Sequence, residues 1–495
     1  MAKSMLSTQT EPPSEVQIER ADAWLLVTAD GLRVGQWRAL PHGAVLKSRL
    51  RRRGANNALL MTDLPCTSGT RVVQLTHKRG GSAFERLGAA RRMAAEAVLC
   101  KAGEVIVSAA GFDEPEQGAV LEAVVAALLA QLAELPSRKR ETPPAPRLKR
   151  IRVCGMPATW QALRSEAEAE GNALARALSL LPGNELTPGS YRERVKLLAL
   201  EYGWRCEFLD HAALARRKAG AFLAVVAGSA EADAGILHLR YQPRRARGRA
   251  ALALVGKGIC FDTGGVNLKS ARHMFGMHED MQGSAVALGT LLALTRLEVE
   301  FPIDCWLALA QNHIGPRAYK PNDVVYAMDG TSIEIVHTDA EGRMVLADTL
   351  TLASLRKPAL IIDYATLTGS CIDALGKGYS GVFTNRDELH GLLIDAGRAS
   401  GERVWPFPQD EDYDRLLESN IADIRQCSAD NEADHILAAR FLRRFVKSEV
   451  PWVHLDLSAA NVKGGLAHIP TETTGFGVRY SLNLLLDQKI LERLP

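Results

Sequence analysis

The segment HTDAEGR, residues 337–343, carries acidic residues at Asp339 and Glu341 and a basic residue at Arg343. It follows an apolar run and precedes a helix-like segment. Because side chains two residues apart in an extended chain point to the same side, we expect the two carboxylates to converge. Two carboxylates in a desolvated cleft repel strongly unless one is protonated or a cation lies between them. The pattern therefore indicates either a protonated carboxylate or a cation between the two side chains.

Two further acids strengthen the prediction of a cation. Asp262 lies in GKGICFDTGG, and Asp280 lies in HEDMQGS. Together with Asp339 and Glu341 they make four carboxylates. Oxygen-rich ligation without His or Cys suits hard or borderline divalent metals, and four carboxylates can hold two of them.

Each motif alone has a simpler interpretation. Acids at 339 and 341 are favourable at the start of a helix. The glycine-rich segment 256–265 fits a turn or a phosphate loop, although it lacks the G-x-x-x-x-G-K-[ST] spacing. Asp280 alone fits an N-cap of the helix expected over 284–297, and Lys257 alone fits a surface turn.

The elements that must position these residues form an α/β pattern. Short runs rich in Val, Ile, Leu and Ala predict strands buried on both faces, in a mostly parallel central sheet flanked by helices. Functional groups collect at the carboxyl ends of such strands, and both charge clusters directly follow one of these runs, so a shared site is predicted. The runs are residues 250–256, 303–310, 332–337, 359–365 and 452–458.

The domain organisation follows from a break in composition. Residues 134–150 are proline-containing and basic, which indicates an exposed linker. We predict a small α/β domain over 1–140, a linker over 141–154 and a larger α/β catalytic domain over 155–495. The segment 410–435 is too polar to assign.

Charge and apolar patterning restrict the partners and the location. The chain has 60 Lys and Arg against 57 Asp and Glu, so net charge gives no argument for nucleic acid or membrane. The first 20 residues lack the apolar core of a signal peptide, and no run reaches about 18 apolar residues. We expect a soluble cytoplasmic protein.

Several motifs in one order resemble the leucine aminopeptidase (cytosol aminopeptidase) family. They are VGKGICFDTGGVNLKS, HEDMQGSA, HTDAEGRMVLADTL and DYATLTGSC, and the resemblance covers roughly residues 155–490. It implies a metalloaminopeptidase that removes N-terminal amino acids from peptides with a free N-terminus. It also implies a homohexamer.

The resemblance assigns metal ligands residue by residue. Asp262 and Glu341 would bridge two divalent ions, Zn or Mn, with Asp339 completing one site and Lys257 and Asp280 the other. A lysine ligand must be neutral, so adjacent dications would drive the pKa of Lys257 far below its usual value of about 10.4.

Catalytic and substrate-binding roles also come from the resemblance. One metal would bind the α-amine, and the pair would activate a water that attacks the first peptide carbonyl. Lys269 would stabilise the oxyanion, and Arg343 would hold a bicarbonate ion that serves as general base. The substrate-binding residues would be Met277, Thr366, Leu367 and Gly369.

The sequence departs from the family pattern at the site. His337 stands where the family usually has Asn, and MQGSA replaces a glycine pair after Asp280. Asp434 and His435 replace small residues near the substrate side-chain pocket. Bulkier, polar lining there predicts that leucine is disfavoured relative to small or basic residues.

Two other functions are compatible with parts of the sequence. A metal-dependent phosphatase or nuclease uses similar acids, but its substrate phosphates usually call for more cations around the metals. DNA binding, as the main role or in addition to peptidase activity, is suggested by basic runs at 47–53, 138–150 and 244–249. Such runs are usually solvated loops.

Overall fold

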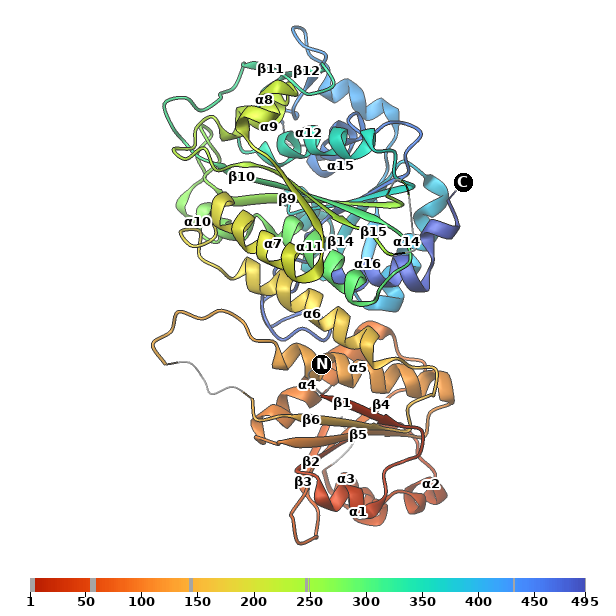
Figure 1. Ribbon diagram of the computed structural model, residues 1–495. Helices are drawn as coiled ribbons and strands as arrows, with labels where there is room; N and C mark the ends of the chain where they lie inside the picture. Colours follow the sequence, from red (N-terminus) through yellow and green to blue (C-terminus); the bar gives the residue numbers. More distant parts are fainter. Residues whose placement is uncertain are drawn as a thin grey trace. The chain divides into compact units, whose positions relative to one another are not determined.

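The computed structural model describes residues 5–53, 59–141, 146–244, 248, 250–430 and 432–494. The chain folds into two compact units (Figure 1). Unit 1 comprises Met1–Ala169 with Lys463–Glu472, and unit 2 comprises Glu170–Val462 with Thr473–Pro495.

Unit 1 is a six-stranded sheet with helices on both faces. All neighbouring strands are parallel except the edge pair β4 and β3. The strand order is β1 (Leu6–Gln9), β6 (Arg150–Cys154), β5 (Glu104–Ala110), β2 (Ala23–Ala29), β4 (Arg71–His77) and β3 (Leu59–Asp63). The helices are α1 (Glu15–Arg20), α2 (Val34–Ala39), α3 (Gly43–Arg53), α4 (Ala83–Leu99) and α5 (Glu114–Leu132).

Strand β2 explains the two-sided core of unit 1. Its side chains alternate between faces, as a period of two requires. Leu25 and Val27 join the cluster built with α4 and α5, whereas Trp24 and Leu26 join a smaller cluster that contains Ile18 of α1. Both faces of the unit 1 sheet are therefore buried at β2.

The predicted linker requires a correction at its carboxyl end. Residues 142–145 lie outside the described residues, but β6 falls within the predicted range 141–154 and is an internal strand of unit 1. Its apolar residues Ile151 and Val153 are fully buried. The composition suggested a linker because arginines alternate with these two residues. Unit 1 then continues to Ala169.

Unit 2 is built on an eight-stranded mixed sheet, which confirms the predicted α/β class. Its central strands β17, β13, β9 and β10 are parallel, and antiparallel pairs occur toward both edges. The strand order is β15 (Val404–Pro406), β14 (Ser380–Thr384), β17 (Trp452–Asp456), β13 (Leu360–Ala365), β9 (Leu252–Asp262), β10 (Ile303–Asn312), β8 (Gly235–Tyr241) and β7 (Arg205–Leu209).

Helices cover both faces of the eight-stranded sheet. Figure 1 shows α8, α9, α12 and α15 on one face and α7, α11 and α16 on the other. The boundary between the two units falls within α6 (Ala162–Ser179). The α-helices of unit 2 are α7 (Pro188–Tyr202), α8 (His211–Arg216), α9 (Gly220–Val226), α10 (Ala271–Met274), α11 (Gln282–Arg296), α12 (Glu341–Leu355), α13 (Gly369–Leu375), α14 (His390–Ser400), α15 (Asp434–Arg443) and α16 (Val478–Leu482).

Two strand predictions near the charge clusters need correction. Strand β9 continues beyond Gly256 to Asp262, so Lys257 lies within a strand and not in a turn. The run 332–337 gives only β12 (Ser332–Glu334), which belongs to a separate sheet with β11 (Val324–Tyr326) and β16 (Ile424–Arg425). The second charge cluster therefore does not follow a strand of the main sheet.

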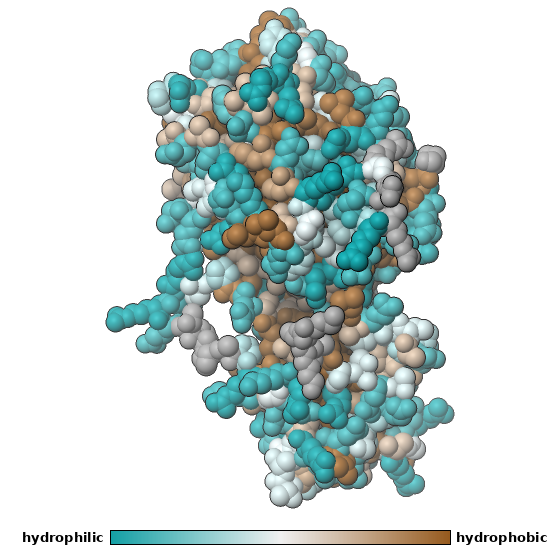
Figure 2. All heavy atoms as spheres, in the orientation of Figure 1, coloured by the Kyte–Doolittle hydropathy of each residue, from teal (hydrophilic) through white to brown (hydrophobic). Residues whose placement is uncertain are grey.

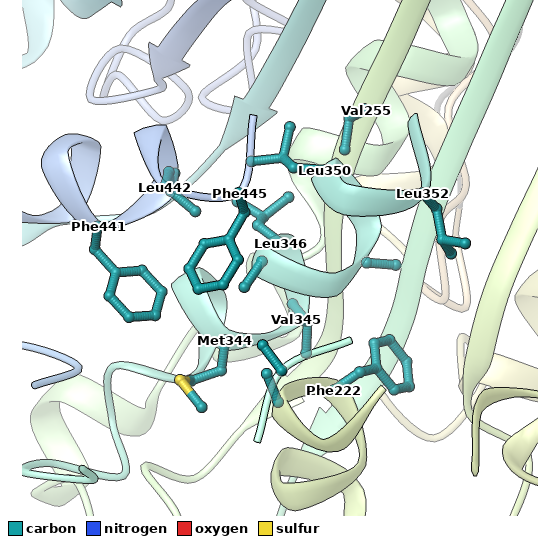
Figure 3. Close-up of a cluster of buried hydrophobic side chains, with 14 of the residues drawn as sticks. Phe222, Val255, Met344, Val345, Leu346, Leu350, Leu352, Phe441, Leu442 and Phe445 are labelled. Carbon is teal, nitrogen blue, oxygen red and sulfur yellow. The ribbon is translucent and has the colours of Figure 1, made fainter. Parts of the chain in front are cut away.

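Helix α12 is the buried centre of unit 2. Every residue from Glu341 to Ser354 is buried. Figure 3 shows apolar side chains of this helix, including Met344 and Leu346, among the aromatic rings of Phe441 and Phe445 from the α15 region. A helix enclosed in this way holds its first residues in fixed positions.

No helix in the part of the chain that the structure describes is both long and apolar enough to cross a bilayer. The face drawn in Figure 2 is mostly hydrophilic, with apolar residues in scattered groups.

Candidate functional site

The site begins where two parallel strands end side by side. Asp262 is the last residue of β9, and it pairs with Asn312, the last residue of β10, after a shift in register between Ala310 and Asn312. Asn312 Nδ2 donates to Asp262 Oδ1 over 2.8 Å and lies 3.4 Å from Glu341 Oε2. The same group donates to the carbonyl of Thr338 over 3.0 Å. One buried amide therefore joins β9, β10 and the segment that enters α12.

Asp339 and Glu341 are placed by a turn and a helix start, and not by an extended segment as predicted. Glu341 is the first residue of α12, and Ala340 occupies the N-cap. The simpler interpretation of this motif was correct about local structure. It was incomplete about chemistry, because Glu341 is only 1% exposed and faces ionisable groups from other elements.

The first lysine lies between two buried acids. Lys257 Nζ is 2.8 Å from Asp280 Oδ1 and 3.0 Å from Glu341 Oε1. It also donates to the Thr366 carbonyl over 2.8 Å. Asp280 is not the N-cap of α11, since Met281 holds that position. The simpler interpretations of Lys257 and Asp280 are both wrong.

The second lysine joins the other two acids. Lys269 Nζ lies 2.8 Å from Asp262 Oδ2 and 2.5 Å from Asp339 Oδ1. The loop between β9 and Lys269 turns through Gly264 and Gly265, both at positive φ. A Cβ on Gly264 would lie 2.5 Å from the Asn267 carbonyl oxygen, so this turn needs glycine. The glycines therefore form the turn that the simpler interpretation expected, and this turn brings Lys269 to the acids.

Burial and mutual repulsion make the carboxylates unusually basic. Burial first, and the charge of Asp262 second, raise the pKa of Asp339 to about 7 and that of Glu341 to about 7. Burial raises the pKa of Asp280 to about 6. Burial alone would lower the pKa of Lys257, but the surrounding carboxylates outweigh it and raise that pKa. The lowered pKa predicted for Lys257 depends on adjacent dications.

The cluster fits divalent cations. Oxygen atoms of Asp262, Asp280 and Glu341 all lie within 4.8 Å of one another, and the three side chains are buried. Four acids face only two lysines, and the buried Asp280 Oδ2 has no hydrogen-bond partner among the described residues. Buried carboxylates without matching cations are typical of sites that bind metals.

Arg343 lies beside the cluster and contacts a residue of its own chain. The side chain is 2% exposed, Nη1 donates to the Gln426 carbonyl over 3.2 Å, and Nη2 pairs with Asp434 Oδ1 at 2.7 Å. Burial would lower its pKa, but Asp434 outweighs this and raises it. The carboxylate that Arg343 contacts is therefore internal.

The residues predicted to bind substrate lie around the loop after β13. Thr366 Oγ1 donates to Asp280 Oδ1 over 2.7 Å, so Thr366 supports the acidic cluster through both its hydroxyl and its carbonyl. The Leu367 amide donates to Asp456 Oδ1 over 3.2 Å and is not a free donor. Gly369, the first residue of α13, is exposed, and Met277 is half-buried in a 3₁₀ turn before Asp280.

His435 and His337 also have defined surroundings. His435 is 9% exposed, its ring Nδ1 lies 3.0 Å from Ser370 Oγ, and its ring meets Phe407 edge-on. His337 Nδ1 accepts a hydrogen bond from the Asp339 amide over 3.3 Å. His337 thus supports the turn that carries Asp339.

The sequence prediction missed Asn312, Gln426 and Asp456. Asn312 had a usable signal, because it is a polar residue directly after an apolar strand, as Asp262 is. Gln426, whose Oε1 accepts from the Val336 and His337 amides, lies in the segment too polar to assign.

Comparison with known proteins agrees with this geometry. Residues 173–482 match the family model described as the cytosol aminopeptidase family, catalytic domain. The chain belongs to this family. It is therefore an aminopeptidase, as predicted, and the phosphatase or nuclease interpretation is not supported.

Relatives of the cytosol aminopeptidase family match over nearly the full length. A probable cytosol aminopeptidase of Bordetella pertussis is 38% identical over 502 residues, covering 97% of this chain and 99% of the relative. One from Solibacter usitatus is 36% identical over 442 residues, covering 88% of this chain and 91% of the relative.

Solved structures show the same fold. A tomato leucine aminopeptidase mutant has a TM-score of 0.86 at 26% identity and covers 98% of this chain and 97% of its own. The bottromycin maturation enzyme BotP in complex with Mn has a TM-score of 0.81 at 30% identity, covering 95% of this chain and all of its own.

Proposed function

We propose that this aminopeptidase removes N-terminal amino acids from peptides by using two divalent metal ions held in the acidic cluster. The observation that carries the proposal is the convergence of four acids and two lysines, most of them buried, at one edge of the sheet. The Mn complex of BotP supports a divalent ion in this fold, and Mn and Zn both suit the donor set.

The proposed ligands divide between two ions. Asp262 pairs with Lys269 and Glu341 pairs with Lys257, and Asn312 Nδ2 lies within 3.4 Å of both carboxylates. This shared partner supports the proposal that Asp262 and Glu341 bridge the two ions. Asp339 would complete one site, and Lys257 with Asp280 would complete the other. Bound ions would activate a water molecule and polarise the scissile carbonyl.

The two lysines have different tasks in this proposal. Lys257 is 3% exposed and must lose its proton to serve as a ligand. Lys269 keeps its proton and is 14% exposed. With Asp262 and Asp339 acting as metal ligands, its ammonium group would donate to the substrate carbonyl oxygen as negative charge develops there.

The peptide would lie beside the loop after β13. Leu367 and Gly369 would position its backbone, with Thr366 and Met277 at the edge of the cluster. Since the Leu367 amide is already bonded to Asp456, any contact from Leu367 to a substrate would use another group.

Other sequence-based predictions remain predictions. They are the homohexamer, the cytoplasmic location, the bicarbonate at Arg343 and the preference against leucine. DNA binding also stays a prediction. The basic run 47–53 forms the end of α3, whereas within 244–249 only residues 244 and 248 are described. Salt-dependent retention on DNA would test it, because phosphate contacts release counterions.

A panel of aminoacyl anilides tests the proposed function. Metal-free enzyme should be inactive, and Zn, Mn or Co should restore hydrolysis of substrates with a free α-amine. Anilides with an acetylated α-amine provide the control and should not react. Full activity after complete removal of metal would contradict the proposal.

A further inference from the structure

The Arg343 guanidinium is a buried cation whose anion comes from the same chain. Its Nη2 is 2.7 Å from Asp434 Oδ1, and its Nη1 is bonded to the Gln426 carbonyl. A buried guanidinium needs a paired anion, because leaving one charge alone in a desolvated site is strongly unfavourable. Asp434 meets this requirement without a molecule from solution.

The fold holds Asp434 in place from two directions. Asp434 is the first residue of α15, and the residue before it, Ala433, adopts the left-handed conformation with φ 52°. The next residue, His435, is anchored to Ser370 by its amide over 2.9 Å. Aromatic rings of the α15 region pack against α12, the helix that carries Arg343 (Figure 3). The carboxylate and the guanidinium are therefore positioned by rigid elements.

The ion pair is connected to the acidic cluster by a short chain of contacts. The His337 amide donates to Gln426 Oε1 over 3.2 Å, and His337 Nδ1 accepts from the Asp339 amide. Arg343 Nη1 in turn donates to the carbonyl of the same Gln426. Gln426 and His337 thus connect the ion pair to a predicted metal ligand.

Asp434 also has an unused acceptor. Among the described residues only Oδ1 accepts a side-chain hydrogen bond, and the side chain is 17% exposed. Nη1 and Nη2 of Arg343 each have a partner, whereas its buried Nε has none among the described residues. An oxyanion from solution would therefore have to displace Asp434 to pair with Nη2.

We propose that Asp434 is the built-in carboxylate of this site and takes the role that the family resemblance gives to bicarbonate at Arg343. This inference rests on the proposed peptidase function. Asp434 accepts a proton from the water that attacks the peptide carbonyl. The water oxygen forms a C–O bond to the carbonyl carbon while the C=O π pair moves to the carbonyl oxygen. The carbonyl then re-forms as the C–N bond breaks, and Asp434 passes the proton to the leaving amine. Water is the only co-reactant, and no external anion is consumed or required.

Chemical rescue tests the proposal. Asp434→Ala should lower kcat on the order of 10²-fold, as expected for loss of a positioned proton acceptor. Formate or bicarbonate should restore much of that loss in a concentration-dependent way, because the variant leaves a carboxylate-sized space beside Arg343. The wild-type enzyme should keep full activity in buffer freed of bicarbonate and should not respond to formate.

A binding measurement on metal-free protein separates this inference from the proposed function. Titration calorimetry should detect formate binding to Asp434→Ala and none to the wild type. Asp430→Ala, which removes an exposed carboxylate four residues earlier, should behave as the wild type. Formate binding to wild type and Asp434→Ala with equal affinity would overturn the inference, even if the enzyme proves to be a metallopeptidase.

A second variant, Asp434→Asn, controls for the possibility that Asp434→Ala misfolds. Asp434→Asn keeps an oxygen that accepts from Arg343, so it should fold, lose kcat similarly and resist rescue because the space is filled. Normal kcat in Asp434→Asn would overturn the inference. A wild-type enzyme that loses activity without bicarbonate and regains it on addition would do the same.

Discussion

The carboxyl edges of the two sheets carry different chemistry. In unit 2, β9, β10 and β17 end in Asp262, Asn312 and Asp456, all of them nearly inaccessible. In unit 1, β2 and β5 end in alanine, and the acid that follows β2, Asp30, is exposed. Both edges have the topology that favours a site, but among the described residues only the strands of unit 2 end in buried carboxylates.

The opposite edge of the unit 1 sheet extends this comparison. A hollow of about 750 Å³ there is lined by charged residues, including Asp22, Asp63 and Arg71. Asp63 pairs with Arg71 at 2.5 Å, and Asp22 accepts hydrogen bonds from the amides of Gly103 and Glu104. These acids are matched by donors in an exposed setting. Charged residues at the edge of a sheet indicate catalysis only when they are buried without enough partners of opposite charge.

The largest effect should come from Lys269. Its replacement by Ala should lower kcat on the order of 10²- to 10³-fold, or about 2.7 to 4 kcal/mol, if it donates to the oxyanion. Steady-state kinetics with an aminoacyl anilide measure this loss. A change confined to KM would show that Lys269 only helps to bind the substrate.

The next effect should come from Asn312, which orients two predicted ligands. Asn312→Ala should weaken metal binding by about 10- to 100-fold, as is typical when a partner of a ligand is lost. Competition with a fluorescent chelator measures the affinity. Gln311→Ala provides the matched control in the neighbouring strand position, and an equal loss there would point to a general disturbance of β10.

Much of the fold was predictable because its strands are continuous apolar runs. The predicted runs 303–310, 359–365 and 452–458 appear as β10, β13 and β17, with bounds that differ by one or two residues. Strand β6 was missed because alternating arginines mask its buried residues Ile151 and Val153. Strand β9 was cut short because Lys257 interrupts the run, and only the tertiary structure supplies the acids that allow a buried lysine.

The predicted metal-site residues do converge, but the local reason given for two of them was wrong. Asp339 and Glu341 meet the cluster through a turn and a helix start. The partnership of Arg343 with Asp434 joins residues 91 positions apart and depends on how α15 packs against α12. No local pattern contains that information.

Asp348, a buried acid outside the site, tests whether burial alone is sufficient to give an acid a role in catalysis. Asp348 of α12 accepts hydrogen bonds from the Phe222 amide over 2.8 Å and the Met328 amide over 2.7 Å. Asp348→Asn should cost about 1 to 3 kcal/mol, because the Asn amide would place a donor against one of these donors. Catalysis per folded molecule should not change.

The difference in the free energy of unfolding between wild type and Asp348→Asn, called the stability gap below, should depend on pH. Burial raises its pKa to about 7, so between about pH 4 and 7 the folded state holds more protons than the unfolded state. Its contribution to stability is largest in acid and falls as the pH rises through 7, whereas Asn does not titrate. Urea unfolding of metal-free protein at pH 5 and pH 8 should show the gap narrowing with pH. A widening gap would contradict the raised pKa.

The smallest effect should come from the exposed edge of unit 1. Asp22→Ala removes two bonds to backbone amides in an exposed setting and should cost no more than about 1 kcal/mol. The metal content and kcat should match those of the wild type. A loss of activity in this variant would show that the two edges are not independent in function.

The central claim is that the buried acids of unit 2 hold two divalent ions, and metal analysis of wild type and Glu341→Gln tests it most directly. After exposure to Zn or Mn and removal of free ions, the wild type should retain two ions per chain. Glu341→Gln should lose ions from both sites, because Glu341 is the proposed bridging ligand. Two ions retained by Glu341→Gln, or none bound by the wild type, would contradict the account.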